Sequence, residues 1–274
     1  MNQLYVFVDS ERPDQYLNCI VHCVLERDVR TIVFLHIKSL TSTDADRHNP
    51  GLSARVMAAV QSQLESLAER LEYLSHAGPS VPGRQSLTEI YGSQRTLEIG
   101  AYYRRVRELP LSWSNRELAY EELRPVLKEL AALGASAFLD VTAVKKRYLG
   151  DIVAAGLVEG VRGLWTFDLL VSGVDFSAPW SMLIHDLRDA KPSAYRYTNV
   201  LDTDTYKSCV RLIFVRAPRY RRLAIGTVVL IVAGALGYFV LGEDHAAVKL
   251  VMALSGIASI AALVLVFTPP RTAT

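Results

Sequence analysis

Two long uncharged apolar stretches near the C-terminus constrain this chain more than any other feature. They are Leu223–Leu241 and Leu250–Phe267, joined by the short polar link Gly242–Lys249. Each has a length within the roughly 17–25 residues that a helix needs to cross a bilayer core about 30 Å thick. Each is also apolar on every face, whereas a helix on the surface of a soluble domain keeps one polar side. We therefore predict a two-helix transmembrane hairpin over residues 216–274, with a buried soluble hairpin as the alternative.

The charges that flank the two stretches predict the orientation of this hairpin. Arginines precede the first stretch and follow the second: Arg216, Arg219, Arg221, Arg222 and Arg271. The link instead carries Glu243 and Asp244 against the single Lys249. Basic flanks stay on the cytoplasmic side of a membrane. We therefore expect a two-pass protein of the bacterial inner membrane with both termini in the cytoplasm, and the N-terminal residues show no signal-peptide pattern.

Composition narrows the classes of partner. The chain has 30 basic and 28 acidic residues and a formal net charge of +2. The local excess of base lies at the predicted membrane boundary, where lipid head groups account for it, so we expect no direct binding to a nucleic-acid polymer. Cys19, Cys23 and Cys209 include no second pair that would complete a zinc site. We expect buried thiols, no metal and no cofactor.

Residues 1–215 alternate between strand and helix patterns, which predicts one cytoplasmic domain. Continuous apolar runs, typical of strands buried on both faces of a parallel sheet, occur at Leu4–Val8, Thr31–Ile37, Ser136–Val141 and Gly163–Leu169. Alternating patterns predict a closing hairpin of two strands, Tyr195–Val200 and Lys207–Val215. The predicted fold is therefore α/β and Rossmann-like: a mostly parallel sheet with an antiparallel edge and helices on both faces.

The helices are predicted from apolar spacing and from their ends. Leucines and valines recur every three or four residues over 50–77, which predicts one long amphipathic helix. The spacing of Ser114 and Glu117 is that of a capping box and predicts a helix to about Leu133, which Pro125 kinks or starts afresh. Between these helices, the pattern of residues 78–113 predicts secondary structure less clearly. Leu87–Tyr91 is a candidate strand, and Leu97–Leu109 fits either type of element.

The most specific polar feature of the domain follows the strand Ser136–Val141, where the chain passes into a helix. Ligands of open α/β sheets bind outside the carboxyl ends of the strands, and a helix N-terminus offers free N–H groups to an anion. The hydroxyl of Thr142 and the ammonium groups of Lys145 and Lys146 suit a phosphate. In the alternative interpretation, Asp140 or Thr142 caps the helix and the lysines are solvated.

This segment, Asp140-Val-Thr-Ala-Val-Lys-Lys146, resembles the D-[LV]-T-G-G-T-K turn of CARF domains, the Rossmann-like sensors of cyclic oligonucleotides in type III CRISPR systems. Asp140, Thr142 and Lys146 match that turn, while Ala143, Val144 and Lys145 replace its small central residues. The order of elements is similar over about residues 1–170, and SAVED domains of cyclic-oligonucleotide immunity are similar in layout. The resemblance implies a second ligand loop after the first strand, where Asp9 and Ser10 lie.

With the hairpin, the resemblance implies a membrane effector of bacterial antiphage immunity. A cyclic di- or oligonucleotide, made by a partner cyclase or polymerase, would bind to the domain and change the packing of the hairpin in the lipid bilayer. Such sensors often dimerise, so we expect a homodimer or higher homo-oligomer, with residues 50–77 nearest the partner. The ligand-binding residues that this interpretation predicts are Asp9, Ser10, Asp140, Thr142, Lys145 and Lys146.

An enzyme is the alternative. Asp9, Asp140 and Asp168 all follow or end predicted strands, which would suit a membrane-anchored nucleotide hydrolase or glycosidase. The chain has no nucleophile-elbow, P-loop or metalloprotease motif, and its histidines are scattered singly. We therefore expect a sensor rather than an enzyme, with no catalytic residue.

Overall fold

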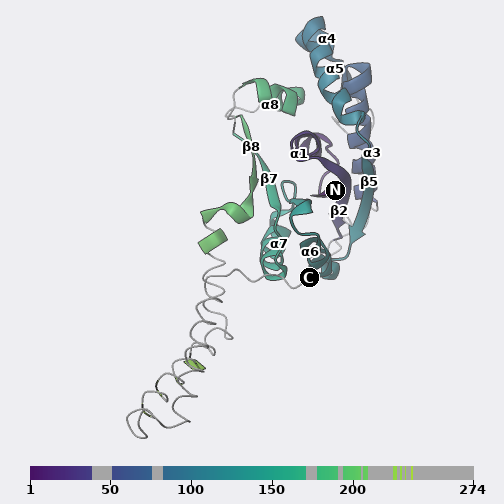
Figure 1. Cartoon of the computed structure of the whole chain (residues 1–274). Coiled ribbons are helices and arrows are strands. Elements are labelled where there is room, and N and C mark those ends of the chain that lie inside the picture. Colours follow the sequence, from purple (N-terminus) through teal and green to yellow (C-terminus); the bar gives the residue numbers. More distant parts are fainter. Residues whose placement is uncertain are drawn as a thin grey trace. The chain divides into compact units, whose positions relative to one another are not determined.

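The computed structural model describes residues 1–38, 51–75, 83–170, 178–190, 194–204 and 206–208, together with the single positions 225, 226, 229, 232 and 236. The chain divides into two compact units, Met1–Asp202 and Thr203–Thr274. Each unit is described by itself below, and the elements carry the labels of Figure 1.

A mostly parallel six-stranded sheet forms the centre of the first unit. Across the sheet, the strands are β5 (Ser112–Leu118), β2 (Val29–Ile37), β1 (Asn2–Phe7), β6 (Ala137–Asp140), β7 (Leu164–Leu169) and β8 (Tyr195–Asn199). Only β7 and β8 pair antiparallel. Counted along the chain, the spatial order is therefore 3-2-1-4-5-6, the order of doubly wound Rossmann-like sheets. The predicted α/β class and its antiparallel edge are confirmed.

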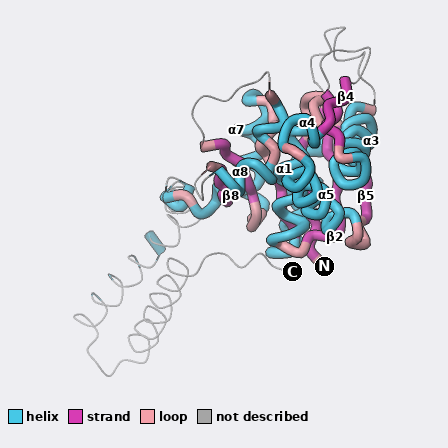
Figure 2. Tube along the Cα trace, turned by 90° about the horizontal axis from the view of Figure 1, so that it is seen from above, coloured by secondary structure: helices cyan, strands magenta, loops and turns pink. Residues whose placement is uncertain are grey.

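Helices cover both faces of the sheet. One face packs against α1 (Asp14–Glu26), α3 (Leu52–Glu65) and α5 (Ser93–Arg107), which lie together in Figure 2. The other face packs against α6 (Leu123–Leu133) and α7 (Lys146–Glu159), which lie side by side in Figure 1. Alternate residues of β1 enter the two cores, with Leu4 and Val6 in one and Phe7 in the other. Burial on both faces explains why these strands are continuous apolar runs.

Shorter elements complete the unit. A π-helical turn, η1 (Ser66–Arg70), leads into a small antiparallel pair, β3 (Glu72–Ser75) and β4 (Gly83–Ser86), and then α4 (Leu87–Tyr91). The remaining elements are η2 (Tyr120–Glu122), η3 (Gly134–Ser136), η4 (Pro179–Met182), α8 (Ile184–Ala190) and η5 (Val200–Asp202). The amide of Asn18 on α1 donates to the carbonyl of Met182 at 2.8 Å and accepts the N–H of Ile184 at 2.8 Å. These two bonds fix the start of α8 against α1.

The long helix predicted for residues 50–77 is shorter than expected. Helical structure ends at Arg70, because Leu71 takes a left-handed backbone conformation with φ of 58°. Leu74 then lies in β3, where its N–H donates to Oε1 of Gln63 at 3.2 Å. Leu67 and Leu74 are both buried. The apolar spacing therefore continues past the end of the helix, which misled the prediction.

The predicted capping box at Ser114 and Glu117 is wrong, because both residues lie in β5. The carboxylate of Glu117 instead accepts the hydroxyl of Ser53 at 2.7 Å. A capping contact occurs further on, where the N–H of Ala119 donates to Oε2 of Glu122 at 2.7 Å. The following helix α6 begins at Leu123, so Pro125 lies in its first turn, where a missing N–H costs little.

Two further predictions need correction. Leu87–Tyr91 is the helix α4 rather than a strand, and most of the ambiguous Leu97–Leu109 segment belongs to α5. Strand β8 pairs with the preceding β7. Lys207 is helical, so the second strand of the predicted closing hairpin does not begin there, and residues 209–215 lie outside the described residues.

Among the described residues, no helix combines the length and apolar character needed to cross a bilayer. The predicted spans Leu223–Leu241 and Leu250–Phe267 fall outside those residues, except for five helical positions of the first span. Its four described aliphatic side chains are exposed by half or more: Ile225 54%, Val229 59%, Val232 50% and Leu236 61%.

Candidate functional site

The direction of winding reverses between β1 and β6, the two central strands. They lie parallel, with Val6 opposite Asp140, so their carboxyl ends meet at one edge of the sheet. The loop after β1 leads to α1 on one face, and the loop after β6 leads to α7 on the other. This reversal is the point at which open α/β sheets bind their ligands.

Two of the predicted ligand-binding residues meet at this point. The ammonium Nζ of Lys145, after β6, lies 2.7 Å from Oδ1 of Asp9, after β1. Their side chains are 38% and 23% exposed, so water screens the pair only in part. Partly solvated ion pairs contribute about 0–1 kcal/mol. An anion with more negative charge than the Asp9 carboxylate could therefore displace Asp9 from Lys145 at little cost.

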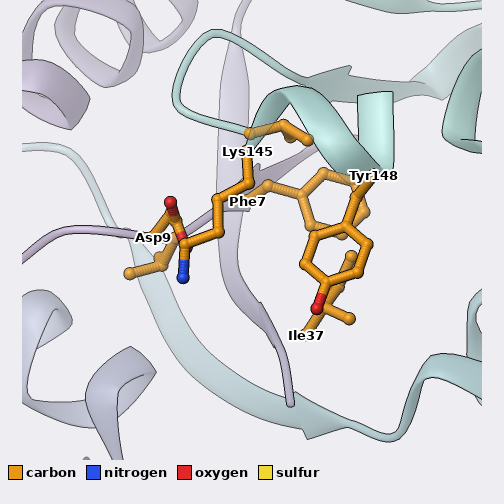
Figure 3. A pocket seen from close by; sticks show the side chains of 7 residues that line it. Phe7, Asp9, Ile37, Lys145 and Tyr148 are labelled. Carbon is orange, nitrogen blue, oxygen red and sulfur yellow. The ribbon is translucent and has the colours of Figure 1, made fainter. Parts of the chain in front are cut away.

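A small hollow adjoins this ion pair (Figure 3). It is lined by Phe7, Val8, Asp9, Ile37, Val144, Lys145 and Tyr148. The space between its walls is about 210 Å³, a figure that includes open solvent, so the hollow is a shallow depression and not an enclosed pocket.

The helix that follows begins later than predicted. Residues 141–144 form a turn in which the N–H of Val144 donates to the carbonyl of Val141 at 3.2 Å. Lys145 is then the N-cap residue of α7, and Lys146 is its first helical residue. This places Lys145 over the hollow, whereas Lys146 is exposed and does not line it. Lys145 is therefore the cation of the hollow, although Lys146 is the residue that matches the CARF turn.

Asp140 positions the loop from inside the protein. It ends β6, is 1% exposed, and does not line the hollow. Its Oδ1 accepts the N–H of Thr142 at 3.0 Å, while Oδ2 makes no hydrogen bond to a described residue. Burial raises the pKa of Asp140 to about 6, although the hydrogen bond from Thr142 offsets part of that rise. This carboxyl group therefore stays protonated at a higher pH than an ordinary aspartate.

Thr142 ties the same loop to the sheet. Its Oγ1 accepts the N–H of Phe167 on β7 at 2.8 Å. Helix α7 carries no side-chain cap, so neither Asp140 nor Thr142 has the capping role of the alternative interpretation. Together the two residues hold the backbone that presents Lys145.

The loop after β1 uses its polar groups internally. The N–H groups of Asp9 and Ser10 both donate to Oη of Tyr16, at 3.1 and 3.0 Å, and that hydroxyl donates to the carbonyl of Ser10 at 2.9 Å. The Ser10 hydroxyl donates to Oε1 of Gln15 at 3.2 Å and accepts the N–H of Arg12 at 3.3 Å. Ser10 does not line the hollow. The predicted ligand contact by Ser10 therefore has no support in this arrangement.

Two tyrosines of the site were not predicted from the sequence. Tyr16 is 1% exposed and lies on the buried face of α1. Tyr148 is 6% exposed and lines the hollow from α7. An aromatic residue one helical turn into the helix that follows a ligand loop is the signal that could have identified both.

The three carboxylates proposed for the alternative enzyme do not form a reactive pair. Asp9 is paired with Lys145, Asp140 is buried, and Asp168 is exposed with a 3.4 Å contact to the hydroxyl of Thr166. No contact joins any two of them within the described part of the chain. Those residues also contain no group of three or more His, Cys, Asp or Glu side chains suited to a metal ion.

Comparison with protein-family models, curated proteins and solved structures found no match for this chain.

Proposed function

We propose that this chain is a membrane effector of bacterial antiphage immunity that binds a cyclic di- or oligonucleotide at the hollow beside Lys145. The observation that carries the proposal is the ion pair between Lys145 and Asp9, at the edge where β1 and β6 meet. A phosphate group competes with Asp9 for the same ammonium. Because the resident pair is partly solvated, this exchange costs little.

The competition also supplies a means of signalling. A ligand shifts an equilibrium only through different affinities for the two states. Phosphate binding at Lys145 would release the carboxylate of Asp9, whose backbone N–H is bonded to Tyr16 of α1. The ligand would therefore favour a second arrangement of the loop after β1, and that change would pass to the rest of the chain.

The size of the hollow supports a homodimer. The hollow is shallow and partly open to solvent, so it would cover only part of a cyclic dinucleotide. A second copy of the chain would supply a second hollow for the remainder of the ligand, and two-fold pairing is the commonest closed arrangement of identical subunits. Sedimentation of the purified protein with and without ligand would detect this pairing.

Membrane attachment is supported by the second unit. Ile225, Val229, Val232 and Leu236 recur every three or four residues and are exposed by half or more, which gives one apolar helical face. We propose that lipid covers this face and that both termini are cytoplasmic. Cysteine labelling at Asp244 and Thr274, in a protein without its native cysteines, tests the orientation. Labelling of Thr274 from the periplasmic side would contradict it.

The function is tested by calorimetry of the full chain in lipid nanodiscs. The panel contains cyclic mononucleotides, cyclic dinucleotides and cyclic tri- to hexa-adenylates, with chromatography of the recovered ligand. The proposal expects one class of cyclic nucleotide to bind and to be recovered intact. Conversion of the ligand would favour the alternative, a nucleotide hydrolase. If no cyclic nucleotide of the panel binds, the proposal that this chain is a nucleotide sensor is wrong.

A further inference from the structure

We propose that His185 is an acid-sensitive latch, which fixes α8 to α4 and α5 while its imidazole is neutral and releases α8 when the imidazole takes up a proton. The latch lies outside the hollow at Lys145 and does not depend on the proposed nucleotide binding. Along the chain, α8 is followed by β8 and η5, and the second unit begins directly after η5, at Thr203. Release of α8 would therefore act on the segment that leads into the predicted membrane hairpin.

His185 lies at the centre of a buried chain of hydrogen bonds. It is 4% exposed, and Tyr103 is 0% exposed. Nδ1 of His185 lies 2.8 Å from Oη of Tyr103 on α5, and Nε2 lies 3.4 Å from Oη of Tyr91 on α4. The Tyr91 hydroxyl in turn donates to Oδ2 of Asp186 on α8. One imidazole ring thus joins α8 to two other helices.

The donors of this chain define which ring nitrogen of His185 carries the proton. A carboxylate only accepts, so the Tyr91 hydroxyl donates to Asp186 and its oxygen is left to accept the N–H of Nε2. Nδ1 of the neutral ring then has no proton and accepts the hydroxyl of Tyr103. This tautomer is assigned from the network of partners, and it satisfies both tyrosine hydroxyls at once.

Protonation of His185 would break the chain at Tyr103. Both nitrogens of an imidazolium ring carry N–H groups, and neither can accept. The Tyr103 hydroxyl bonds no other residue that the structure describes, so it would become a buried donor without an acceptor. Such a group is destabilising. The attached position of α8 is therefore compatible with the neutral ring and not with the charged one.

The environment of the ring also opposes its charge. Burial lowers the pKa of His185 from its ordinary 6.5 to about 3, and the guanidinium of Arg95 on α5 adds to that fall. The attachment is thus complete above pH 6.5 and weakens as the pH falls toward 3. Asp186 has the opposite sign, because burial raises its pKa and its protonation favours the attached state. The pKa of Tyr103 is raised, so that this hydroxyl keeps its proton, by burial and by the nearby Tyr102, Tyr91, Asp186 and Asp14.

The other contacts of α8 do not respond to acid in this way. The apolar side chains of Leu183, Ile184 and Leu187 are buried, and their burial does not change with pH. Outside them lie two ion pairs with partly exposed side chains, Arg188 with Glu26 at 3.6 Å and Arg95 with Asp189. Such pairs contribute little. His185 is therefore the contact through which a proton would release α8.

The test measures hydrogen exchange of the α8 amides in the full chain in nanodiscs, without nucleotide, at pH 7.5 and pH 5. The parent is compared with His185→Gln, whose neutral side chain can still accept from Tyr103 and donate to Tyr91. The matched histidine control is His36→Gln. His36 lies on β2, where its Nδ1 is 2.7 Å from Oε2 of Glu117.

Each pH unit below 6.5 should raise the released fraction of the parent about tenfold. The ratio of the parent's exchange rate to that of His185→Gln at the same pH removes the intrinsic pH dependence of exchange. For the α8 amides, this ratio should be about thirtyfold higher at pH 5 than at pH 7.5. His36→Gln should show the same rise as the parent.

A second measurement needs no variant. Deuterium exchange at the imidazole C2 position of His185 in the parent should have a rate that does not change between pH 5 and pH 7.5, because the ring stays neutral while α8 is attached. A titration with a midpoint near pH 6.5 would show that the attached ring accepts a proton, and would overturn the latch.

Two outcomes of the amide measurement would also contradict the proposal. An equal ratio at both pH values would mean that protonation of His185 does not release α8. A rise of similar size in every helix of the first unit would mean that acid unfolds the whole unit. Since no nucleotide is present, neither outcome bears on the proposed nucleotide site.

Discussion

The two loops at the reversal of the sheet differ in how they use their polar groups. The loop after β1 directs two N–H groups onto the hydroxyl of Tyr16, so its anion-binding donors are satisfied within the protein. The loop after β6 is tied to the sheet through Asp140 and Thr142 but leaves the ammonium of Lys145 partly exposed. Both loops occupy the edge where Rossmann-like folds bind ligands.

The difference shows that position on this edge does not by itself make a binding loop. The N–H groups of such a loop remain available to a ligand only where no side chain of the following helix accepts their hydrogen bonds. Tyr16 on α1 satisfies the donors of the first loop, whereas Tyr148 on α7 lines the hollow and makes no hydrogen bond to the described residues of the second loop. We therefore assign the proposed ligand contact to the loop after β6, whose cation Lys145 stays partly exposed.

The largest expected effect is a charge reversal at Lys145. Lys145→Glu removes the cation of the hollow and places a second carboxylate beside Asp9. Binding of a cyclic nucleotide should weaken by about 2–5 kcal/mol, as when one member of a charge pair is disturbed. Calorimetry of the full chain measures this loss.

Lys146→Glu is the matched control for this charge reversal. Lys146 is exposed in the first turn of α7, where a glutamate is favoured by about 0.3–1 kcal/mol. The Lys146→Glu protein should be at least as stable as the parent and should lose much less affinity than Lys145→Glu. An equal loss for both variants would mean that a diffuse positive field, rather than Lys145, attracts the ligand.

The second effect concerns Asp140, the buried carboxyl group that precedes the loop after β6. Because the pKa of Asp140 is raised from 3.8 to about 6, the native protein keeps a proton that the unfolded chain has already lost between about pH 4 and 6. Its free energy of unfolding should therefore fall as pH rises through that window, by on the order of 3 kcal/mol. The neutral variant Asp140→Asn should lack this fall.

Urea unfolding in mild detergent, followed by tryptophan fluorescence between pH 4 and pH 7, measures this difference. The stability of Asp140→Asn relative to the parent should rise with pH. Parallel pH dependences of the two proteins would mean that Asp140 titrates like an exposed carboxylate. The loop would then be held by some other contact.

The third effect concerns Tyr16→Phe, which removes the hydroxyl that binds the loop after β1. The N–H groups of Asp9 and Ser10 lose their acceptor, which should cost about 1–3 kcal/mol of unfolding free energy. Tyr5→Phe is the control, since its hydroxyl donates to Oε1 of Gln3 at 2.7 Å, and this substitution should cost less unfolding free energy. If Tyr16→Phe and Tyr5→Phe lose the same amount of unfolding free energy, the hydrogen bonds from the loop after β1 to Tyr16 do not stabilise the protein.

The smallest effect is expected at Asp9. Asp9→Asn removes the carboxylate that competes for Lys145 while keeping its size. Affinity for a cyclic nucleotide should rise by a few-fold, because the displaced pair is worth about 0–1 kcal/mol. A fall in affinity would show that Asp9 contacts the ligand directly, as the sequence-based interpretation expected.

The sequence predicts the fold well where burial leaves a simple pattern. Continuous apolar runs identify β1, β2, β6 and β7, and the order of elements then places Asp9 and Lys145 at one edge. Strand β5 was missed because its residues are mostly exposed and polar. Its pairing with β2 is a long-range contact that no local pattern records.

The details of the site are harder to predict for a related reason. Assigning the start of α7 to Thr142 rather than Lys146 rotates the helix, and that rotation decides which lysine faces the hollow. Tyr16 and Tyr148 look like ordinary core residues in the sequence. The role of Tyr16 depends on where its hydroxyl oxygen lies, which spacing along the chain does not determine.

Hydrogen exchange of the full chain in nanodiscs tests the central claim most directly. Amides are compared with and without each cyclic nucleotide at saturating concentration. We predict slower exchange over residues 141–148, with the amides of Asp9 and Ser10 unchanged or faster as Asp9 is released. Protection of the loop after β1 with none at residues 141–148, or no change with any nucleotide, would contradict it.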